Sequence, residues 1–261
     1  MPDTALITGA SSGIGREFAR LHAARGGDVI ITARREAELQ ALKEEIEAAH
    51  GVTVHIIALD LGAEGGANAL WDRVTELGIP VDILINNAGF GGQGAFIERD
   101  LAQDLAMIDL NVKALVTLTH HAARAMADRG RGKILQVSST AAYIPGPLQA
   151  TYYATKAFVS SFSMALDQEM RAKGVTCTAL EPGYVQTGFA DAADLEGTDL
   201  VGAGEKGAQP ADVARIGYEA MLAGKLRVIN DPMLRLQLRW LIPFAPHRMV
   251  LKMIEKMQTK R

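Results

Sequence analysis

A serine, a tyrosine and a lysine are spaced so that they could transfer a proton. Ser139 follows an apolar segment, residues 133–137, and Tyr152 comes thirteen residues after it. Lys156 lies four residues beyond Tyr152, so in a helix both side chains would share one face, about 6 Å apart. A nearby ammonium lowers the pKa of a phenol, which is ordinarily near ~10. We expect Tyr152 to be an acid/base group and Ser139 to bond the substrate oxygen, although such pairs also occur on helix surfaces without a function.

A glycine-rich loop near the N-terminus predicts a dinucleotide site. The apolar segment Thr4–Thr8 leads directly into this loop, and a helical pattern follows it. Glycine has no Cβ and adopts positive φ, so the backbone can approach a pyrophosphate while the helix N-terminus offers free N–H groups. The loop residues that we expect to bind the cofactor are Gly9, Ser11, Ser12, Gly13, Ile14 and Gly15.

Two arginines predict which dinucleotide binds. The second expected strand, Asp28–Ala33, is followed by Arg34 and Arg35. An NAD-selective fold places an acidic residue here against the ribose 2′-hydroxyl, whereas arginine favours a 2′-phosphate. We predict NADP(H) over NAD(H), with Arg34 as the main contact and Arg35 as the second. The alternative is that both are solvated residues at the start of the next helix.

Apolar segments and helical patterns alternate along most of the chain. Residues 53–59 and 81–85 are further expected strands, and polar or small residues follow each of them. Such residues suit the crevice at the carboxyl ends of parallel strands, where open α/β sheets bind ligands. The alternation predicts an α/β fold whose parallel sheet is covered on both faces. The candidates for cofactor binding at these strand ends are Asp60, Leu61, Asn87, Ala88 and Gly89.

Taken together, the motifs resemble those of the short-chain dehydrogenase/reductase family. From residue 4 to about 190 they occur in the family's order: Thr8-Gly9-x-x-x-Gly13-x-Gly15, Asn86-Asn87-Ala88-Gly89, Asn111, Ser139, Tyr152-x-x-x-Lys156 and Pro182-Gly183. The resemblance implies one Rossmann-type, doubly wound domain over residues 1–231, with a parallel seven-stranded sheet in the order 3-2-1-4-5-6-7. It also implies that Asn111, on a long helix over residues 100–128, holds a water that links Lys156 to solvent, and that Lys156 binds the nicotinamide ribose beside Tyr152.

The loop after the expected strand at residues 174–180 continues this resemblance. In the family this loop lies over the nicotinamide, which implies cofactor contacts from Pro182, Gly183, Val185 and Thr187. Residues 188–209 are small, acidic and glycine-rich, without clear periodicity. We expect a mobile substrate lid there, with a simple surface connection as the alternative.

Residues 232–261 form a basic C-terminal extension. They contain seven Lys or Arg and one acid, so this segment is +6 and the remainder of the chain is −9. Met249, Met253 and Met257 recur at helical spacing, which predicts a basic amphipathic helix. Three roles remain open: contact with an anionic membrane surface, packing across a subunit interface, or covering the substrate pocket. The extension resembles the tails of a poorly defined bacterial subgroup of the family, which implies no particular substrate.

Composition limits the class of protein. The chain has 261 residues, of which 48% are hydrophobic, enough for one large α/β domain. Its net charge of −3 argues against nucleic-acid binding that depends on neutralising phosphates. Cys177 is the only cysteine and the histidines show no ligand spacing, so we expect no disulfide, no metal and a reducing cytoplasm. We expect no secretory signal and no spanning helix, since no apolar run approaches the ~18 residues that such a helix needs.

These features predict an oxidoreductase that transfers a hydride between NADP(H) and a carbonyl or secondary alcohol. No arginine stands out in the expected substrate loops to bind a carboxylate, so the substrate should be a hydrophobic small molecule. The expected lining residues are Phe90, Tyr143, Ile144, Leu148, Tyr184 and Phe189. The alternatives are a non-catalytic NADP(H)-sensing protein on a membrane surface, or a family enzyme that uses the hydride only transiently. The resemblance also implies a homodimer or homotetramer, with contacts along the helix at residues 152–173.

Overall fold

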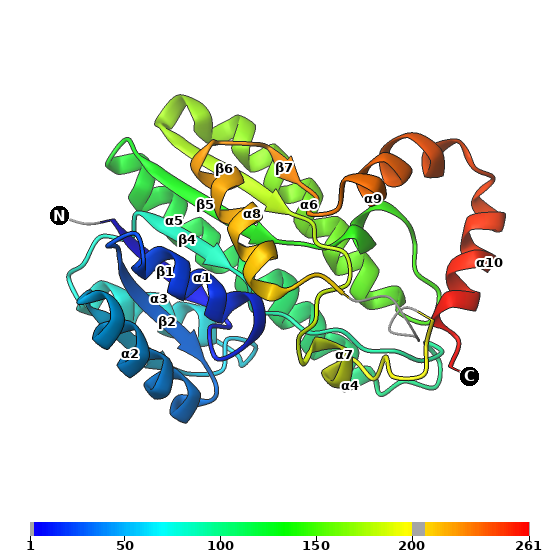
Figure 1. Cartoon of the computed structure of the whole chain (residues 1–261), viewed down its shortest axis with the longest axis horizontal. Coiled ribbons are helices and arrows are strands. Elements are labelled where there is room, and N and C mark those ends of the chain that lie inside the picture. Colours follow the sequence, from blue (N-terminus) through cyan, green and yellow to red (C-terminus); the bar gives the residue numbers. More distant parts are fainter. Residues whose placement is uncertain (1–2, 200–206, 261) are drawn as a thin grey trace.

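A parallel β-sheet forms the centre of the computed structural model, which describes residues 3–199 and 207–260. In these residues seven strands lie in the order β3-β2-β1-β4-β5-β6-β7, as predicted (Figure 1). Most strand residues are buried, because crossover helices cover both faces of a parallel sheet. The strands are β1 (Thr4–Thr8), β2 (Asp28–Ala33), β3 (Val54–Ala58), β4 (Ile83–Asn86), β5 (Gly132–Val137), β6 (Val175–Leu180) and β7 (Arg227–Val228).

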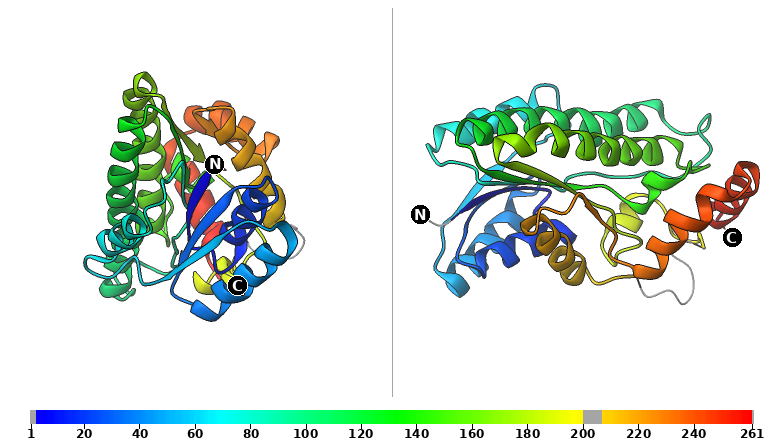
Figure 2. Two further views of the ribbon diagram at one scale, coloured as in Figure 1. Left: turned by 90° about the vertical axis from the view of Figure 1, so that its left-hand side faces the viewer. Right: turned by 90° about the horizontal axis from the view of Figure 1, so that it is seen from above.

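Helices cover the sheet in two layers, which the right-hand view of Figure 2 shows edge-on. Side chains of successive strand residues point to opposite faces, so Ile7 packs in one core cluster with Phe18, and Leu6 packs in the other with Leu118. One layer contains α1 (Gly13–Ala23), α2 (Glu36–His50) and α8 (Pro210–Leu222), and the other contains α3 (Gly66–Glu76), α5 (Leu115–Asp128) and α6 (Ala150–Met170).

The helix that we expected over residues 100–128 contains an irregular turn. Helix α4 (Leu101–Ile108) begins where Asp100 accepts a hydrogen bond from the Ala102 N–H at 3.0 Å. A π-helical turn, Asp109–Ala114, then joins α4 to α5. Such a turn holds one residue more than an α-helical turn and often occurs at functional sites. It contains Asn111, which is 1% exposed.

Several other boundaries differ from the sequence-based expectations. Strand β7 has only two residues, and the helix expected at residues 152–173 ends in a 3₁₀ turn, Arg171–Lys173. The expected lid contains a short helix, α7 (Phe189–Ala192), where no periodicity was evident. Residues 200–206 of that segment lie outside the described residues.

The C-terminal extension lies beyond the carboxyl ends of the strands in Figures 1 and 2. It consists of α9 (Pro232–Leu236), a π turn (Gln237–Leu241), a 3₁₀ turn (Ile242–Phe244) and α10 (His247–Gln258). The expected amphipathic helix is therefore α10, while residues 232–244 form a short helical segment that changes from α to π to 3₁₀ geometry. Within the described residues, none of the helices has the length and apolar character needed to span a bilayer.

Candidate active site

The loop between β1 and α1 can bring its backbone close to a ligand. Gly9 and Gly13 have φ values of 69° and 55°, a region that glycine enters without a steric penalty. A Cβ at Gly15 would collide with the Gly9 carbonyl oxygen, so a larger residue does not fit. Ser12 makes no side-chain cap to α1, which leaves the first N–H groups of the helix available to an anion. The loop therefore fits the pyrophosphate of a dinucleotide.

Thr8 fastens this loop to the end of β4. Its Oγ1 accepts hydrogen bonds from the backbone N–H groups of Asn87 and Ala88, both at 3.0 Å. The Asn87 amide donates in turn to the carbonyl oxygens of Thr8 at 3.0 Å and Gly9 at 3.3 Å. Asn87 and Ala88, both predicted to bind the cofactor, thus lie beside the glycine loop.

The two arginines after β2 occupy different positions. The Arg35 Nη2 donates to the hydroxyl oxygens of Ser11 at 3.0 Å and Ser12 at 2.9 Å. The Arg34 side chain is 78% exposed and lies 3.9 Å from a carboxylate oxygen of Asp60, measured from Nη1. Arg35 is therefore held against the glycine loop, while Arg34 extends into solvent beside Asp60, a residue predicted to bind the cofactor.

Pro182, Gly183, Val185 and Thr187 lie in the loop that follows β6. A Cβ added at Gly13 would lie 3.0 Å from the Thr187 Cγ2, so this loop reaches the glycine loop. The carbonyl oxygen of Pro182 lies 3.5 Å from the Ser139 Oγ, which donates to it. The loop is therefore close to both the expected cofactor site and Ser139.

Ser139 lies close enough to Tyr152 to lower the pKa of its phenol, against the larger effect of burial. Ser139 directly follows β5 and its Oγ accepts a hydrogen bond from the Ala141 N–H at 3.1 Å, which starts a 3₁₀ turn, Thr140–Tyr143. Tyr152 lies in the first turn of α6 and is 8% exposed. The two hydroxyl groups can therefore meet one substrate oxygen.

Lys156 lies one helical turn after Tyr152, as expected. Its Nζ is 5.7 Å from the centroid of the Tyr152 ring and donates to the Val137 carbonyl oxygen at 2.9 Å. The β5 backbone thus holds the ammonium group near the tyrosine.

Asn111 lies next to Lys156 across Gly89. A Cβ added at Gly89 would lie 2.9 Å from the Asn111 Oδ1 and 3.6 Å from the Lys156 Nζ. The Asn111 amide donates to the Phe90 carbonyl oxygen at 2.9 Å, and its Oδ1 accepts from the Phe90 N–H at 3.1 Å. These two bonds fix the asparagine in the π turn, so all four residues predicted to be catalytic lie together.

Burial controls the protonation of this group. It raises the pKa of Tyr152 above the ordinary value, and the hydrogen bond from Ser139 opposes this effect only in part. Burial lowers the pKa of Lys156 to about 8. The tyrosine pKa is therefore raised and not lowered as we expected, because burial disfavours the charged phenolate. At neutral pH the site contains a phenol that can donate a proton and a mostly protonated lysine.

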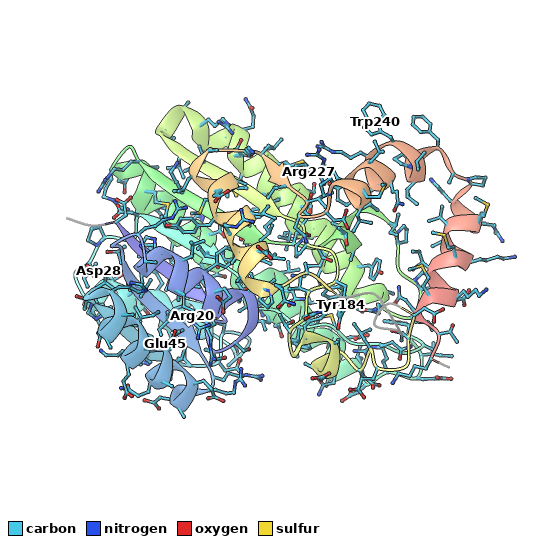
Figure 3. The ribbon with its side chains drawn as sticks, in the orientation of Figure 1. Arg20, Asp28, Glu45, Tyr184, Arg227 and Trp240 are labelled. Atoms are coloured by element: carbon cyan, nitrogen blue, oxygen red, sulfur yellow. The ribbon has the colours of Figure 1, made fainter. Side chains whose placement is uncertain are left out.

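A buried carboxylate connects the elements around the site. Glu181 is fully buried at the end of β6, and Arg227 on β7 donates to both of its oxygens, at 2.6 and 3.0 Å. The hydroxyl groups of Tyr143 and Ser160 also donate to Glu181, each at 2.7 Å. The group therefore joins β6, β7, the turn after β5 and helix α6; Figure 3 labels Arg227.

Apolar side chains surround Tyr152. The centroid of the Phe189 ring on α7 lies 5.4 Å from that of Tyr152, and the Tyr153 ring lies 6.1 Å away. The same cluster contains Phe90, Met107, Ala141 and Ile144. Of the expected lining residues, Phe90, Ile144 and Phe189 thus lie at Tyr152. Tyr143 instead directs its hydroxyl to Glu181, and Tyr184 packs against residues of the expected lid.

The end of α10 contacts this apolar cluster and the expected lid. Gln258 is fully buried; its side-chain amide donates to the Tyr153 hydroxyl at 3.1 Å, and its backbone carbonyl accepts from the Gln93 amide at 2.9 Å. Lys260 forms an ion pair with Asp194 at 2.6 Å. The extension is therefore attached at two points next to the proposed substrate side of the site.

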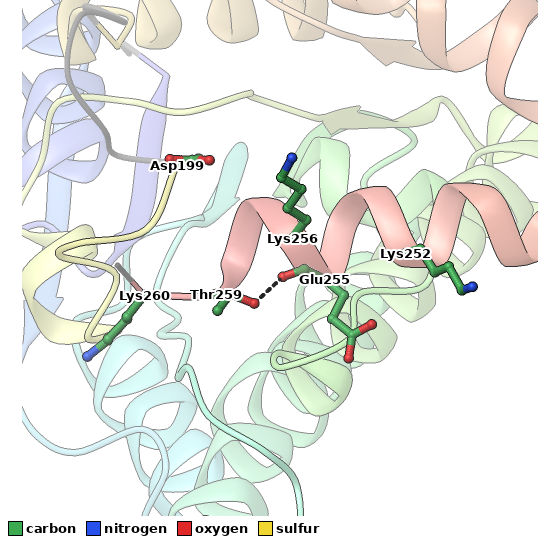
Figure 4. A pocket seen from close by; sticks show the side chains of 6 residues that line it. All are labelled: Asp199, Lys252, Glu255, Lys256, Thr259 and Lys260. Carbon is green, nitrogen blue, oxygen red and sulfur yellow. Dashed lines mark hydrogen bonds between the residues drawn. The ribbon is translucent and has the colours of Figure 1, made fainter.

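A cavity of about 460 Å³ lies where α10 meets the lid segment (Figure 4). Charged side chains dominate its lining, and none of the residues predicted to be catalytic takes part. We therefore do not assign the cavity to the substrate. Its lining residues are Asp199, Lys252, Glu255, Lys256, Thr259 and Lys260. Nowhere in the described ranges do three or more His, Cys, Asp or Glu residues gather in a way that could hold a metal ion.

Comparison with known proteins adds the family. Residues 3–196 match the family model described as short chain dehydrogenase. The protein belongs to the short-chain dehydrogenase family. Members of this family are oxidoreductases that use NAD(H) or NADP(H), so the predicted oxidoreductase class is confirmed.

This short-chain dehydrogenase is similar in sequence to two curated relatives. It is 36% identical over 234 residues to sulfoacetaldehyde reductase 2 of Chromohalobacter salexigens, which covers 87% of this chain and 92% of the relative. It is 37% identical over 187 residues to short chain dehydrogenase MYCFIDRAFT_6125 of Pseudocercospora fijiensis, covering 70% of this chain. That alignment spans 60% of the fungal protein's length.

Solved structures of short-chain dehydrogenases share the fold over nearly the whole chain. A short-chain dehydrogenase from Sphingobium yanoikuyae in complex with NADPH has a TM-score of 0.84 and 29% identity, covering 97% of this chain and 96% of that one. A member from Burkholderia phymatum in complex with NAD has a TM-score of 0.82 and 25% identity, covering 100% of this chain and 97% of that one.

Our sequence reasoning missed Thr8, Glu181 and Arg227 as site residues. Thr8 bonds to Asn87, 79 positions away, and Arg227 bonds to Glu181, 46 positions away. A carboxylate between an apolar strand and Pro182 is itself a signal, because a buried charge requires a partner. The sequence does not indicate which distant residue that partner is.

Proposed function

We propose that this protein transfers a hydride between NADP(H) and the carbonyl or secondary alcohol of a hydrophobic small molecule. The observation that carries the proposal is the assembly of Ser139, Tyr152 and Lys156 in reach of the glycine loop, next to an apolar cluster. The cofactor would supply or accept the hydride at its nicotinamide ring. The chain's own residues would orient the substrate and move the proton.

The proposed proton path begins at Tyr152. In the reduction, its phenol would protonate the substrate oxygen, and Ser139 would hold that oxygen through a hydrogen bond. Lys156 would bind the nicotinamide ribose and keep its charge near the developing phenolate. We assign Asn111 to the relay between Lys156 and solvent, a role that its position across Gly89 supports.

We propose a preference for NADP(H) because Arg34 and Arg35 follow β2. Arg35 lies on the glycine loop through Ser11 and Ser12, and Arg34 has an extended, solvated guanidinium beside Asp60. Both could neutralise a 2′-phosphate. Structural neighbours are complexes with NADPH or with NAD, so the preference rests on this chain's own arginines.

The apolar cluster at Tyr152 supports a hydrophobic substrate. We also propose that residues 1–231 form the dehydrogenase domain and that the extension after it covers the substrate site. A homo-oligomer is also part of this proposal, since Leu101, Leu105 and Ile108 on α4 and Phe158 on α6 are exposed large hydrophobic residues. The family resemblance implies subunit contacts along α6. A cytoplasmic location remains an expectation based on the single buried cysteine.

The deciding experiment measures oxidation of NADPH and NADH with a panel of aliphatic, aromatic and long-chain ketones and aldehydes, with sulfoacetaldehyde as the anionic member. We expect turnover with NADPH on apolar carbonyls. Tyr152→Phe should lower kcat by roughly 10²-fold or more, with little change in the Kd of NADPH. Full turnover by this variant would show that Tyr152 is not the acid, and a preference for sulfoacetaldehyde would contradict the substrate class.

A non-catalytic sensing role is less well supported. The four proposed catalytic residues are present and assembled, and the matched relative from Chromohalobacter salexigens is a reductase. Cofactor binding without turnover on the whole panel would reverse this preference.

A further inference from the structure

The C-terminal extension exposes an unusual concentration of large apolar side chains. Of the sixteen large hydrophobic residues that are exposed in the described part of the chain, seven lie between residues 233 and 253. Phe244 is 82% exposed and Trp240 is 66% exposed; in Figure 3 Trp240 lies at the outer edge of the extension, away from the sheet. The others are Met233, Leu236, Leu241, Met249 and Met253. We call these seven residues the apolar face.

Basic residues adjoin the apolar face. Arg235 and Arg239 are exposed and, with Leu236, Trp240 and Pro232, line a hollow of about 550 Å³. On α10, Arg248 and Lys252 are exposed near Met249 and Met253. An interfacial segment of this composition places aromatic and aliphatic groups at the lipid boundary, while its cations meet anionic headgroups.

The opposite side of α10 is already occupied. Val250 and Ile254 are buried, and Gln258 bonds to Tyr153 and Gln93. This attachment holds the helix in place and leaves Met249 and Met253 outward. The apolar face therefore stays largely exposed in the part of the chain that the structure describes, and no helix among these residues could take the chain across a bilayer.

Charge distinguishes between the possible partners of this face. A symmetric contact between two copies would bring two segments of charge +6 together. An anionic lipid surface attracts the same segment, and the extension lies at one end of the molecule, so the acidic remainder of the chain can stay away from the lipid (Figure 2). We propose that the apolar face docks peripherally on an anionic membrane surface, with Trp240 and Phe244 inserted at the interface.

The test is co-sedimentation of the full-length protein with vesicles. One set contains roughly 30% phosphatidylserine in phosphatidylcholine, the other only phosphatidylcholine. We expect binding to the anionic set, which weakens as salt is raised. Both Trp240→Asp/Phe244→Asp and Arg235→Glu/Arg239→Glu should reduce the bound fraction about tenfold or more. Ile97→Asp, at a residue that is 91% exposed outside the extension, is the matched control and should bind like the unchanged protein.

Two results would contradict the proposal. Absence of binding to anionic vesicles would overturn it, as would equal loss of binding in the Ile97 control. Light scattering of each variant in solution tests a second copy of the chain as the partner. If the unchanged protein does not bind vesicles and Trp240→Asp/Phe244→Asp lowers the oligomeric mass, the apolar face joins two copies. Circular dichroism and NADPH binding of each variant show that it is folded.

Discussion

Lys156 places a titratable charge inside the protein. Its pKa falls from an ordinary value of 10.5 to about 8, so between these values the unfolded chain holds a proton that the folded chain has released. Stability from this group therefore rises with pH across that window, and the penalty for burying the charge is fully present below pH 8.

Replacing Lys156 with methionine should remove that pH dependence. We expect Lys156→Met to be more stable than the unchanged protein at pH 7, by roughly 1–3 kcal/mol, with a smaller difference at pH 9.5. Urea unfolding of both proteins at the two pH values measures this, and the comparison cancels groups that the two share. An equal difference at both pH values would show that the lysine is not appreciably desolvated.

Replacing Arg34 and replacing Arg35 should have different effects on cofactor affinity. Arg34 contacts no part of the glycine loop in the structure, so Arg34→Ala should weaken NADPH roughly tenfold or more and leave NADH unchanged. Arg35 holds Ser11 and Ser12, so Arg35→Ala should weaken both cofactors. Kd values of both cofactors for both variants, by fluorescence titration, provide the comparison. If Arg34→Ala bound NADPH normally, the assignment of the main phosphate contact would move to Arg35.

At the scale of elements, the Glu181–Arg227 pair holds β7 against the loop that follows β6. Arg227→Met leaves a fully buried carboxylate without its cation, and we expect a loss of roughly 3–5 kcal/mol in the free energy of unfolding. The double variant Glu181→Gln/Arg227→Met removes the charge as well and should regain part of that loss. Thermal and urea unfolding of the three proteins test this. A double variant less stable than Arg227→Met would mean that the charge itself is not the cause.

The sequence was sufficient for elements whose signal is local. The apolar run Thr4–Thr8, the glycines after it and the spacing of Tyr152 and Lys156 each lie within a few residues, and the structure places them as expected. Strand order followed from the family resemblance. The contacts of Glu181 could not be predicted, because its partners come from three other segments, and the π turn could not either, since nothing in residues 109–114 breaks the helical pattern.

For the whole molecule, the proposal that the extension covers the substrate site can be tested where α10 is attached. Gln258 bonds to Tyr153, next to the proposed acid. Gln258→Leu keeps much of the packing and loses that bond, so we expect KM for an apolar ketone to rise about fivefold while the Kd of NADPH is unchanged. Gln237→Leu, at an exposed glutamine of the same extension, should leave both values as they are. A change in the Kd of NADPH with Gln258→Leu would show that Gln258 does not act on the substrate side alone.

The π turn at Asp109–Ala114 also affects how the length of this helix can change. The turn takes up its extra residue locally, so deleting one residue from it would give a regular helix in which α4 and α5 keep nearly the same relative phase. One residue removed from α5 itself would instead rotate the part beyond the deletion by about 100°, and Met126, which is buried on α5, would leave the core. A change of one residue is therefore tolerated by the core only at the π turn, and Asn111, which lies in that turn, is the residue whose position it would alter.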